Sequence, residues 1–122
     1  MPTRDELYVL GFDHFAKGHM AEAADCYRKA IEADAKFFDA YEALAQACFQ
    51  LGRFDEAIDV AKHWAALDSE NPMPHTNLSI FYQRKGMVPE AEAEGALSKT
   101  LTWKQELRAT RQAGGSPKEK GH

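Results

Sequence analysis

A repeat runs through this chain of 122 residues, marked by three evenly spaced glycines, Gly18, Gly52 and Gly86. A Glu-Ala pair follows each glycine four and five positions later. A leucine stands eight positions before each glycine, with a small residue directly after it: Leu10-Gly11, Leu44-Ala45 and Leu78-Ser79. Self-similarity at a fixed period of roughly 20–50 residues is typical of folds that stack one supersecondary unit on copies of itself.

Each period divides at its glycine into two amphipathic helices. In the second period, apolar residues recur at the i, i+3, i+4, i+7 spacing of a buried helix face on both sides of Gly52: Tyr41, Leu44, Ala45 and Cys48, then Phe54, Ala57, Ile58 and Ala61. Glycine suits the turn because the residue after a helix often adopts a left-handed backbone. The pattern predicts helices over 4–17, 20–34, 38–51, 54–67, 72–85 and 88 to about 111.

Capping residues mark where several helices begin. Thr3 and Glu6 have the spacing of a capping box, and Asn71-Pro72 is typical of an N-cap followed by proline at the first helical position. The last helix has no breaker between Pro89 and Gly114 that is expected to end it. It carries an apolar stripe beside a basic face (Leu97, Leu101, Trp103, Lys104, Leu107 and Arg108), which indicates a helix that closes the stack.

Composition and charge limit the class of protein. The chain has 15 basic and 19 acidic residues, and no apolar run long enough to span a membrane or to form a secretory signal. We expect one domain over 1–112, cytoplasmic, with no membrane insertion and no nucleic-acid binding, because no concentrated basic face is apparent. Residues 113–122 are rich in glycine and lysine and are expected to form a disordered basic tail.

The sequence offers no constellation for catalysis or for a cofactor. The five histidines and two cysteines match no metal-ligand spacing, and the glycines are spaced singly at turns rather than in a phosphate-binding loop. His14 and His75 fall in core positions of the repeat, where a packed, hydrogen-bonded histidine is expected. We therefore predict a protein that is not an enzyme and needs neither metal nor cofactor.

These residues resemble the tetratricopeptide repeat family. The family's pattern falls on Leu7, Leu10, Gly11, Gly18, Ala23, Tyr27 and Ala30 in the first unit, and on Tyr41, Leu44, Ala45, Gly52, Phe54 and Ala57 in the second. The third unit matches at Leu78, Ser79, Tyr82, Gly86 and Ala91, but it has Gly95 and Ser98 where an aromatic residue and alanine are usual. The resemblance implies an all-α, right-handed α-α superhelix of three units (4–37, 38–71 and 72–105) with a long last helix.

The resemblance also implies that the concave face, lined by the first helix of each unit, binds an extended peptide or a helix of another protein. The corresponding positions in this sequence are Asp5, Tyr8, Phe12, Phe15, Asp39, Glu42, Gln46, Phe49, Asn77 and Ile80. The expected buried stripe of the first helix is Leu7, Leu10, Gly11 and His14. Tyr8, Phe12, Phe15 and Phe49 do not fit this pattern of burial and are the expected apolar anchors. The acidic residues favour an apolar partner segment that carries Lys or Arg.

Three alternatives bear on this interpretation. Related domains that bind the terminal carboxylate of heat-shock chaperone tails use Lys, Arg and Asn at five positions. These positions are occupied here by Tyr8, Phe12, Ala43, Met73 and Asn77, so a chaperone tail is not expected as the ligand.

The last helix, the N-terminus or a second copy could instead cover the aromatic residues. Self-assembly is the third: residues 1–95 hold 17 acidic and 9 basic side chains, whereas residues 96–122 hold 2 and 6, so the basic helix of one copy could enter the acidic groove of another.

Overall fold

A computed structural model describes residues 1–113 of the chain as a stack of antiparallel helices. The helices are α1 (Arg4–Ala16), α2 (Met20–Ala33), α3 (Phe38–Gln50), α4 (Phe54–Leu67), α5 (Met73–Arg84) and α6 (Val88–Gln112). No strand occurs among the described residues. The predicted tail, 113–122, lies outside them apart from Ala113. The predicted all-α fold class is confirmed, and each predicted helix end lies within about one residue of the observed one.

The expected signals begin and end these helices. Thr3 Oγ1 accepts from Glu6 N, and Glu6 Oε1 accepts from Thr3 N, so the capping box is present. Gly18, Gly52 and Gly86 adopt φ values of 81°, 76° and 77° in the three turns, a backbone that residues with a Cβ rarely adopt. At the start of α5 the assigned cap is Pro72 rather than Asn71, although Asn71 Oδ1 still accepts from Met73 N at 3.0 Å.

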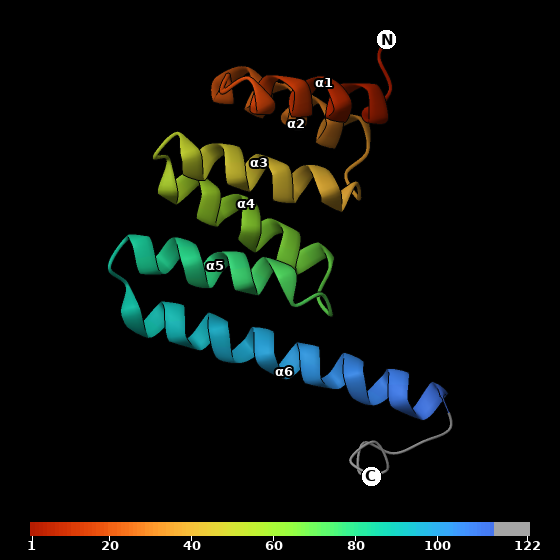
Figure 1. Ribbon diagram of the computed structural model, residues 1–122, viewed down its shortest axis with the longest axis vertical. Coiled ribbons are helices and arrows are strands. Elements are labelled where there is room, and N and C mark those ends of the chain that lie inside the picture. Colours follow the sequence, from red (N-terminus) through yellow and green to blue (C-terminus); the bar gives the residue numbers. More distant parts are fainter. Residues whose placement is uncertain (114–122) are drawn as a thin grey trace.

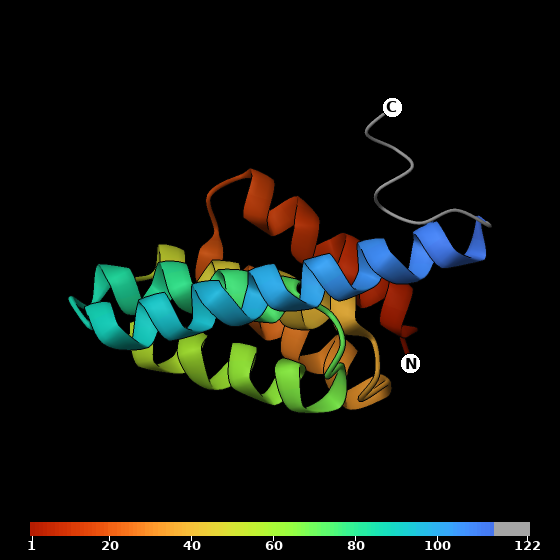
Figure 2. The same cartoon turned by 90° about the horizontal axis from the view of Figure 1, so that it is seen from below.

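The helices pair into three hairpins that stack along the long axis of the molecule (Figure 1). Consecutive helices from α1 to α6 make the main contacts, as expected for units that stack on their neighbours. Seen along the stack, α4 lies on one side of the molecule and the last part of α1 on the other, with α5 between them (Figure 2). The first helices, α1, α3 and α5, therefore offer a different face from the second helices, α2 and α4.

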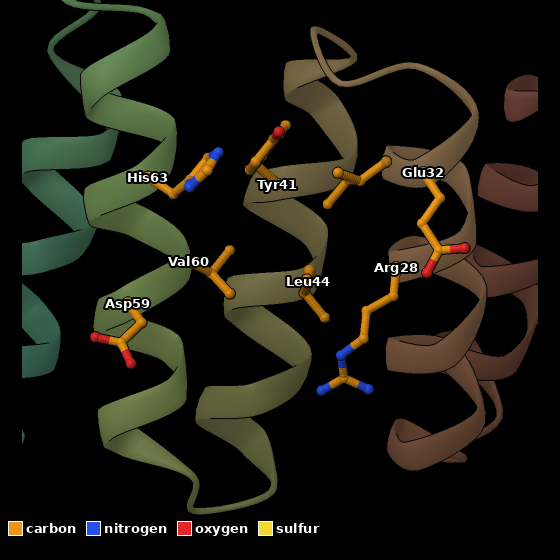
Figure 3. A pocket seen from close by; sticks show the side chains of 8 residues that line it. Arg28, Glu32, Tyr41, Leu44, Asp59, Val60 and His63 are labelled. Atoms are coloured by element: carbon orange, nitrogen blue, oxygen red, sulfur yellow. The ribbon is translucent and has the colours of Figure 1, made fainter.

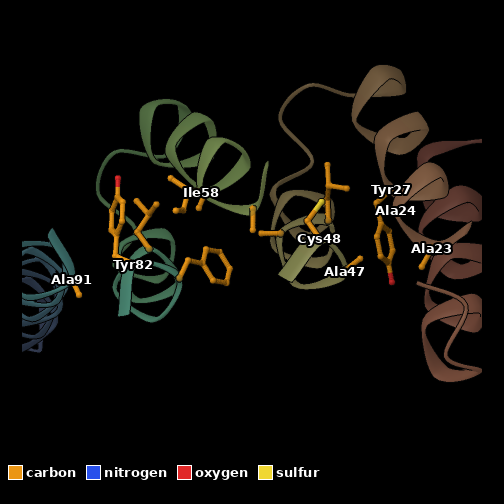
Figure 4. Close-up of a cluster of buried hydrophobic side chains, with 14 residues drawn as sticks. Ala23, Ala24, Tyr27, Ala47, Cys48, Ile58, Tyr82 and Ala91 are labelled. Carbon is orange, nitrogen blue, oxygen red and sulfur yellow. The ribbon is translucent and has the colours of Figure 1, made fainter. Parts of the chain in front are cut away.

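A continuous apolar core runs through the stack from Ala23 to Ala91 (Figure 4). Its members include many alanines with no exposed surface, among them Ala45 and Ala57, which let neighbouring helices approach closely. A smaller buried cluster of Leu7, Ala30, Phe37 and Ala40 packs where the first unit meets the second. Arg28 on α2 also pairs with Glu56 on α4, so a polar contact ties the first unit to the second across α3.

Two core expectations differ in the structure. Leu10 is 49% exposed, whereas its equivalents Leu44 and Leu78 are 4% and 2% exposed. The reason is its position: α1 is the first helix of the stack, and no preceding helix covers that side (Figure 1). His14 is half-buried, and its Nδ1 has no hydrogen-bond partner among the described residues, so it is not the hydrogen-bonded histidine that we expected.

The last helix packs on α5 along its first half, through polar contacts. His75 Nδ1 lies 2.9 Å from Glu94 Oε1, the hydroxyls of Thr76 and Ser98 are 2.6 Å apart, and Ser79 Oγ donates to Ala91 O. His75 thus has the hydrogen bond that we expected. Further along α6, Arg108 pairs with Glu70 in the loop before α5. The stripe predicted to close the stack is only partly covered, because Leu97 and Trp103 stay exposed.

Candidate binding groove

A small hollow of about 140 Å³ lies between α1 and α3, with Tyr27 of α2 behind it. We call it the α1–α3 groove. Six of the ten residues predicted to bind a partner line it together: Tyr8, Phe12, Phe15, Asp39, Glu42 and Gln46. They meet because the repeat places the same face of α1 and α3, the first helices of two successive units, side by side.

Two rings on the aromatic side of the groove differ in how they are covered: Tyr8 packs against other rings, whereas Phe12 is exposed. Tyr8 packs edge-on against Phe37, with ring centroids 5.3 Å apart, and lies 5.7 Å from Tyr27. Phe12, one turn further along α1, is 61% exposed. An exposed phenylalanine beside a hollow can bury its ring against a partner without first losing contacts inside the protein, so Phe12 is the available apolar anchor.

The α3 side of the groove is acidic. Within residues 1–113, no basic side chain forms an ion pair with Asp39 or Glu42. Burial raises the pKa of the Tyr8 hydroxyl, and the negative charges of Asp39 and Glu42 raise it further. The groove therefore has a negative potential next to its aromatic rings, which favours a cationic group on whatever binds there.

Three of the four aromatic residues that we expected to stand clear of the core in fact pack against it. Tyr8, Phe15 and Phe49 are half-buried beside the main core cluster. The Phe49 ring lies 5.0 Å from Phe81 on α5 and 5.4 Å from Phe54 on α4, outside the groove lining. The expectation of exposure was wrong for two reasons: Phe49 is covered by Phe81 of the next unit, and Tyr8 packs on Tyr27 and Phe37 within its own unit.

The remaining predicted residues lie elsewhere. Asp5 borders a hollow on the outer side of α1 rather than the groove. Asn77 is only 4% exposed, and its Nδ2 has no hydrogen-bond partner among the described residues, so it is not an accessible surface residue as we expected. Ile80 is exposed on α5. The structure thus gathers six predicted residues of the first two units and leaves Asp5, Phe49 and the residues of the third unit apart.

Tyr27 is the groove residue that sequence reasoning assigned only to the core. Its side chain is buried, and its ring forms the back wall between α1 and α3. The sequence contained a usable signal: of the small residues that follow the three repeat leucines, Gly11 alone is a glycine. In the structure this position leaves room for the large ring of Tyr27.

A second hollow, of about 380 Å³, lies on the opposite face between α2 and α4, with α3 as its floor (Figure 3). Leu44 and Val60 give it apolar walls, and Tyr41 stacks on His63 at one end, with ring centroids 5.7 Å apart. Arg28 lies on the α2 side, but it is already paired with Asp25 and Glu56. Sequence reasoning did not single out this hollow, because its residues have the pattern of ordinary core and surface positions.

The described residues offer neither a metal site nor a membrane span. Among residues 1–113, no group of three or more His, Cys, Asp or Glu side chains is placed to hold a metal ion. No helix in this part of the chain has the length and apolar character needed to cross a bilayer.

Comparison with known proteins gives a family match and several structural relatives. The family described as tetratricopeptide repeat matches residues 8–72 of this chain. No curated protein sequence matches it. Among solved structures, the crystal structure of MamA superposes with a TM-score of 0.81 at 21% identity, over 85% of this chain and 61% of the MamA chain.

The type III secretion translocator chaperone SycD of Yersinia enterocolitica is also similar, with a TM-score of 0.77 at 22% identity, over 80% of this chain and 73% of SycD. Another SycD structure contains a peptide of the translocator YopD; it has a TM-score of 0.75 at 23% identity, over 80% of this chain and 74% of that one. At these identities, the likeness shows a shared helical-repeat fold.

Proposed function

This chain belongs to the tetratricopeptide repeat family, and from that premise we propose that it is a non-catalytic adaptor that binds a segment of another protein in the α1–α3 groove. The observation that carries the proposal is the exposed Phe12 ring beside the carboxylates of Asp39 and Glu42, which have no basic partner in the described part of the chain. An uncovered aromatic ring exposes apolar surface to water, and a binding partner can bury that ring while a cation on the partner pairs with the neighbouring carboxylates.

The groove favours a peptide or helix with apolar side chains flanked by Lys or Arg. An apolar side chain of the partner would contact Phe12 and the wall formed by Tyr8 and Tyr27. A cation would face Asp39 or Glu42. Each exposed ion pair contributes only about 0.2–1 kcal/mol, so the charges select the partner and speed association, while the aromatic contact supplies most of the affinity.

The peptide-bound SycD structure supports this mode of binding by example. That protein has the same fold as this chain and holds a peptide of its own partner, YopD. The low identity gives no reason to expect the same partner here. It does show that a helical repeat of this size can bind a peptide of another protein.

An array of synthetic peptides tests the proposal, and it does not require the natural partner. The array presents Leu- and Phe-containing peptides flanked by Lys or Arg, the same peptides flanked by Asp or Glu, and uncharged versions. We expect the full chain to bind the basic set, and Phe12→Ala to weaken binding at least about tenfold, the loss expected for one good anchor residue.

A double variant, Asp39→Lys with Glu42→Lys, should shift the preference to the acidic peptides. Asp59→Lys is the matched control, because Asp59 is an exposed acid that lines the hollow on the opposite face. The proposal is wrong if acidic and basic peptides bind equally to the unmodified chain, or if the Asp59 variant changes the preference as much as the groove variant does.

A second candidate function is self-assembly, with the basic α6 of one copy in the α1–α3 groove of another. The observation that favours it is the exposed Trp103, at 60%, beside the exposed Lys104 on α6. Light scattering distinguishes this candidate from the adaptor. Self-assembly through these charges predicts oligomers that dissociate above about 0.5 M salt and in the Asp39→Lys, Glu42→Lys variant, whereas the adaptor forms no oligomer through its groove.

A further inference from the structure

The residues at the two ends of the stack occupy the same positions of the repeat as the residues that join neighbouring units inside it. A hollow of about 610 Å³ on the outer side of α1 is lined by Glu6, Val9, Leu10 and Asp13, among others. Their equivalents one repeat later lie on α3, which packs on α2, and two repeats later on α5, which packs on α4. The outer side of α1 therefore corresponds to the faces of α3 and α5 that pack on the preceding unit. In α1 this face has no preceding unit to cover it.

The other end offers the complementary half. A hollow of about 430 Å³ beside α6 is lined by Ser79, Val88, Glu92, Gly95, Ala96 and Lys99, among others. On α2 and α4, the positions equivalent to Glu92, Gly95, Ala96 and Lys99 belong to the second helix that receives the next unit. Figure 1 shows α1 at one end of the long axis and α6 at the other, so the two halves face away from each other and cannot meet within one molecule.

The two ends have complementary shapes. Val9 and Leu10 project from α1 and are 66% and 49% exposed. On α6, Gly95 stands where α2 has the large Tyr27, and a Cβ added at Gly95 would meet only Ser79 Oγ, at 3.4 Å. A side chain that is missing from the receiving helix leaves room for a larger one on the arriving helix. Val9 is larger than its equivalent Ala43 on α3, while Leu10 keeps the leucine found at Leu44 and Leu78.

Their charges are also complementary at one position. At the first internal interface, Ile31 of α2 packs against the cluster that contains Ala40 of α3. The equivalent residues at the two ends are Lys99 and Glu6, so the same register places a cation opposite a carboxylate. It also brings Glu92 near Asp13, but Asp13 already pairs with Lys17 at 3.0 Å, which supplies a positive charge there.

We propose that a second copy of this chain docks end to end, with α1 of one molecule on α6 of the next. The interface joins two different surfaces, and these lie at opposite ends of the long axis (Figure 1), so successive copies add along that axis and produce open chains of molecules. It leaves the α1–α3 groove free and is therefore independent of the proposed adaptor function.

The association is expected to be weak. Inside the chain, short turns hold neighbouring units together at an effective concentration of the order of millimolar, and separate molecules lack this advantage. The end-to-end contact also includes charged residues where the internal interfaces have Ala, Ile, Phe or Pro. We therefore expect self-association to be detectable at about 0.1–1 mM protein.

Sedimentation velocity and light scattering of the full chain, from about 10 μM to about 1 mM, test the proposal. We expect the average mass to rise with concentration for the unmodified protein. Lys99→Glu and Glu6→Lys should each weaken association at least about tenfold. The two substitutions on the same chain should restore it, which loss of the Glu6 hydrogen bond in the capping box cannot do. Val9→Asp, at an exposed position outside the capping box, should abolish association with an unchanged melting temperature.

The controls separate this contact from the others. Asp39→Lys with Glu42→Lys should leave end-to-end association intact, because both residues lie in the groove. The proposal is overturned if the protein is monomeric at about 1 mM, if the double charge exchange associates no better than either single variant, or if the groove variant abolishes association.

Discussion

The ring of Tyr27 lies directly against Gly11: a Cβ on residue 11 would stand 2.6 Å from Tyr27 Cε1 and 2.8 Å from Cδ1. The close approach of α1 and α2, and with it the back wall of the groove, depends on the absence of a side chain at Gly11. Tyr27 is 1% exposed and its ring packs 5.7 Å from Tyr8, so the ring can give way to a new methyl group only by moving into the groove that it lines. We predict that Gly11→Ala lowers the free energy of unfolding by about 1–3 kcal/mol in urea denaturation.

Gly95→Ala is the matched control, since it adds the same methyl group at a glycine inside another helix. Its new Cβ would meet only Ser79 Oγ, at 3.4 Å. Alanine is the better helix former, so we expect this variant to be neutral or more stable by up to about 1 kcal/mol. Equal destabilisation by both substitutions would show that the contact with Tyr27 is not the cause.

The turn glycines give a second prediction, which concerns backbone conformation. Gly52 has φ of 76°, and nothing lies within 4 Å of a Cβ built on it. Any cost of Gly52→Ala must therefore come from the left-handed backbone itself, which is about 1–2 kcal/mol for a residue with a Cβ. Gly52→Asn should cost less, because asparagine tolerates this conformation, and thermal melting of both variants checks the order.

Phe12 and Phe49 should separate binding from stability. Phe12 is largely exposed, so Phe12→Ala should leave the melting temperature nearly unchanged. Phe49 packs against Phe54 and Phe81, so Phe49→Ala should cost roughly 2–3 kcal/mol, somewhat below the value for a fully buried phenylalanine. Circular dichroism melts of the two single variants test this, and a large loss of stability in Phe12→Ala would contradict the assignment of Phe12 to an open surface.

The two thiols should differ in reactivity. Burial, together with the negative charge of Glu56 and against the opposing effect of Arg28, raises the pKa of Cys48 to about 11. Burial also raises the pKa of Cys26, which is only half-buried. Alkylation by iodoacetamide at pH 8, followed by mass spectrometry, should therefore modify Cys26 first, and Cys48 only when the protein unfolds. Equal rates at both residues would contradict the burial of Cys48.

The same shift predicts a dependence of stability on alkaline pH. The folded state holds the Cys48 proton more tightly than the unfolded state, whose thiol has an ordinary pKa of 9.0. This contribution to stability is complete below about pH 9 and is lost as the pH rises toward 11. Cys48→Ala should flatten the fall in stability over this window, whereas Cys26→Ala should have less effect.

Much of the fold could be predicted because residues close together in the sequence determine where each helix begins and ends. The repeat of Gly18, Gly52 and Gly86, together with the capping box at Thr3, set helix ends that the structure reproduces within about one residue. Such signals act between residues close in sequence, so they do not depend on how the units stack.

Burial at the site could not be predicted in the same way, because it depends on neighbouring units. Leu10 and Leu44 occupy the same position of the repeat, yet only Leu44 is covered by another helix. Phe49 fits the pattern of a surface residue within its own unit and is covered by Phe81 of the next. The pattern did bring Tyr8, Phe12 and Glu42 to one groove, because it places equivalent faces of successive first helices side by side.

Binding of a partner segment in the α1–α3 groove is tested most directly by a nuclear magnetic resonance titration. The ¹⁵N-labelled full chain is titrated with a synthetic peptide of Leu and Phe flanked by Lys and Arg. We predict that the largest amide shift changes fall on Tyr8, Phe12, Glu42 and their neighbours. Changes concentrated on Val60 and His63 of the opposite face, or no saturable changes at millimolar peptide, would contradict binding in this groove.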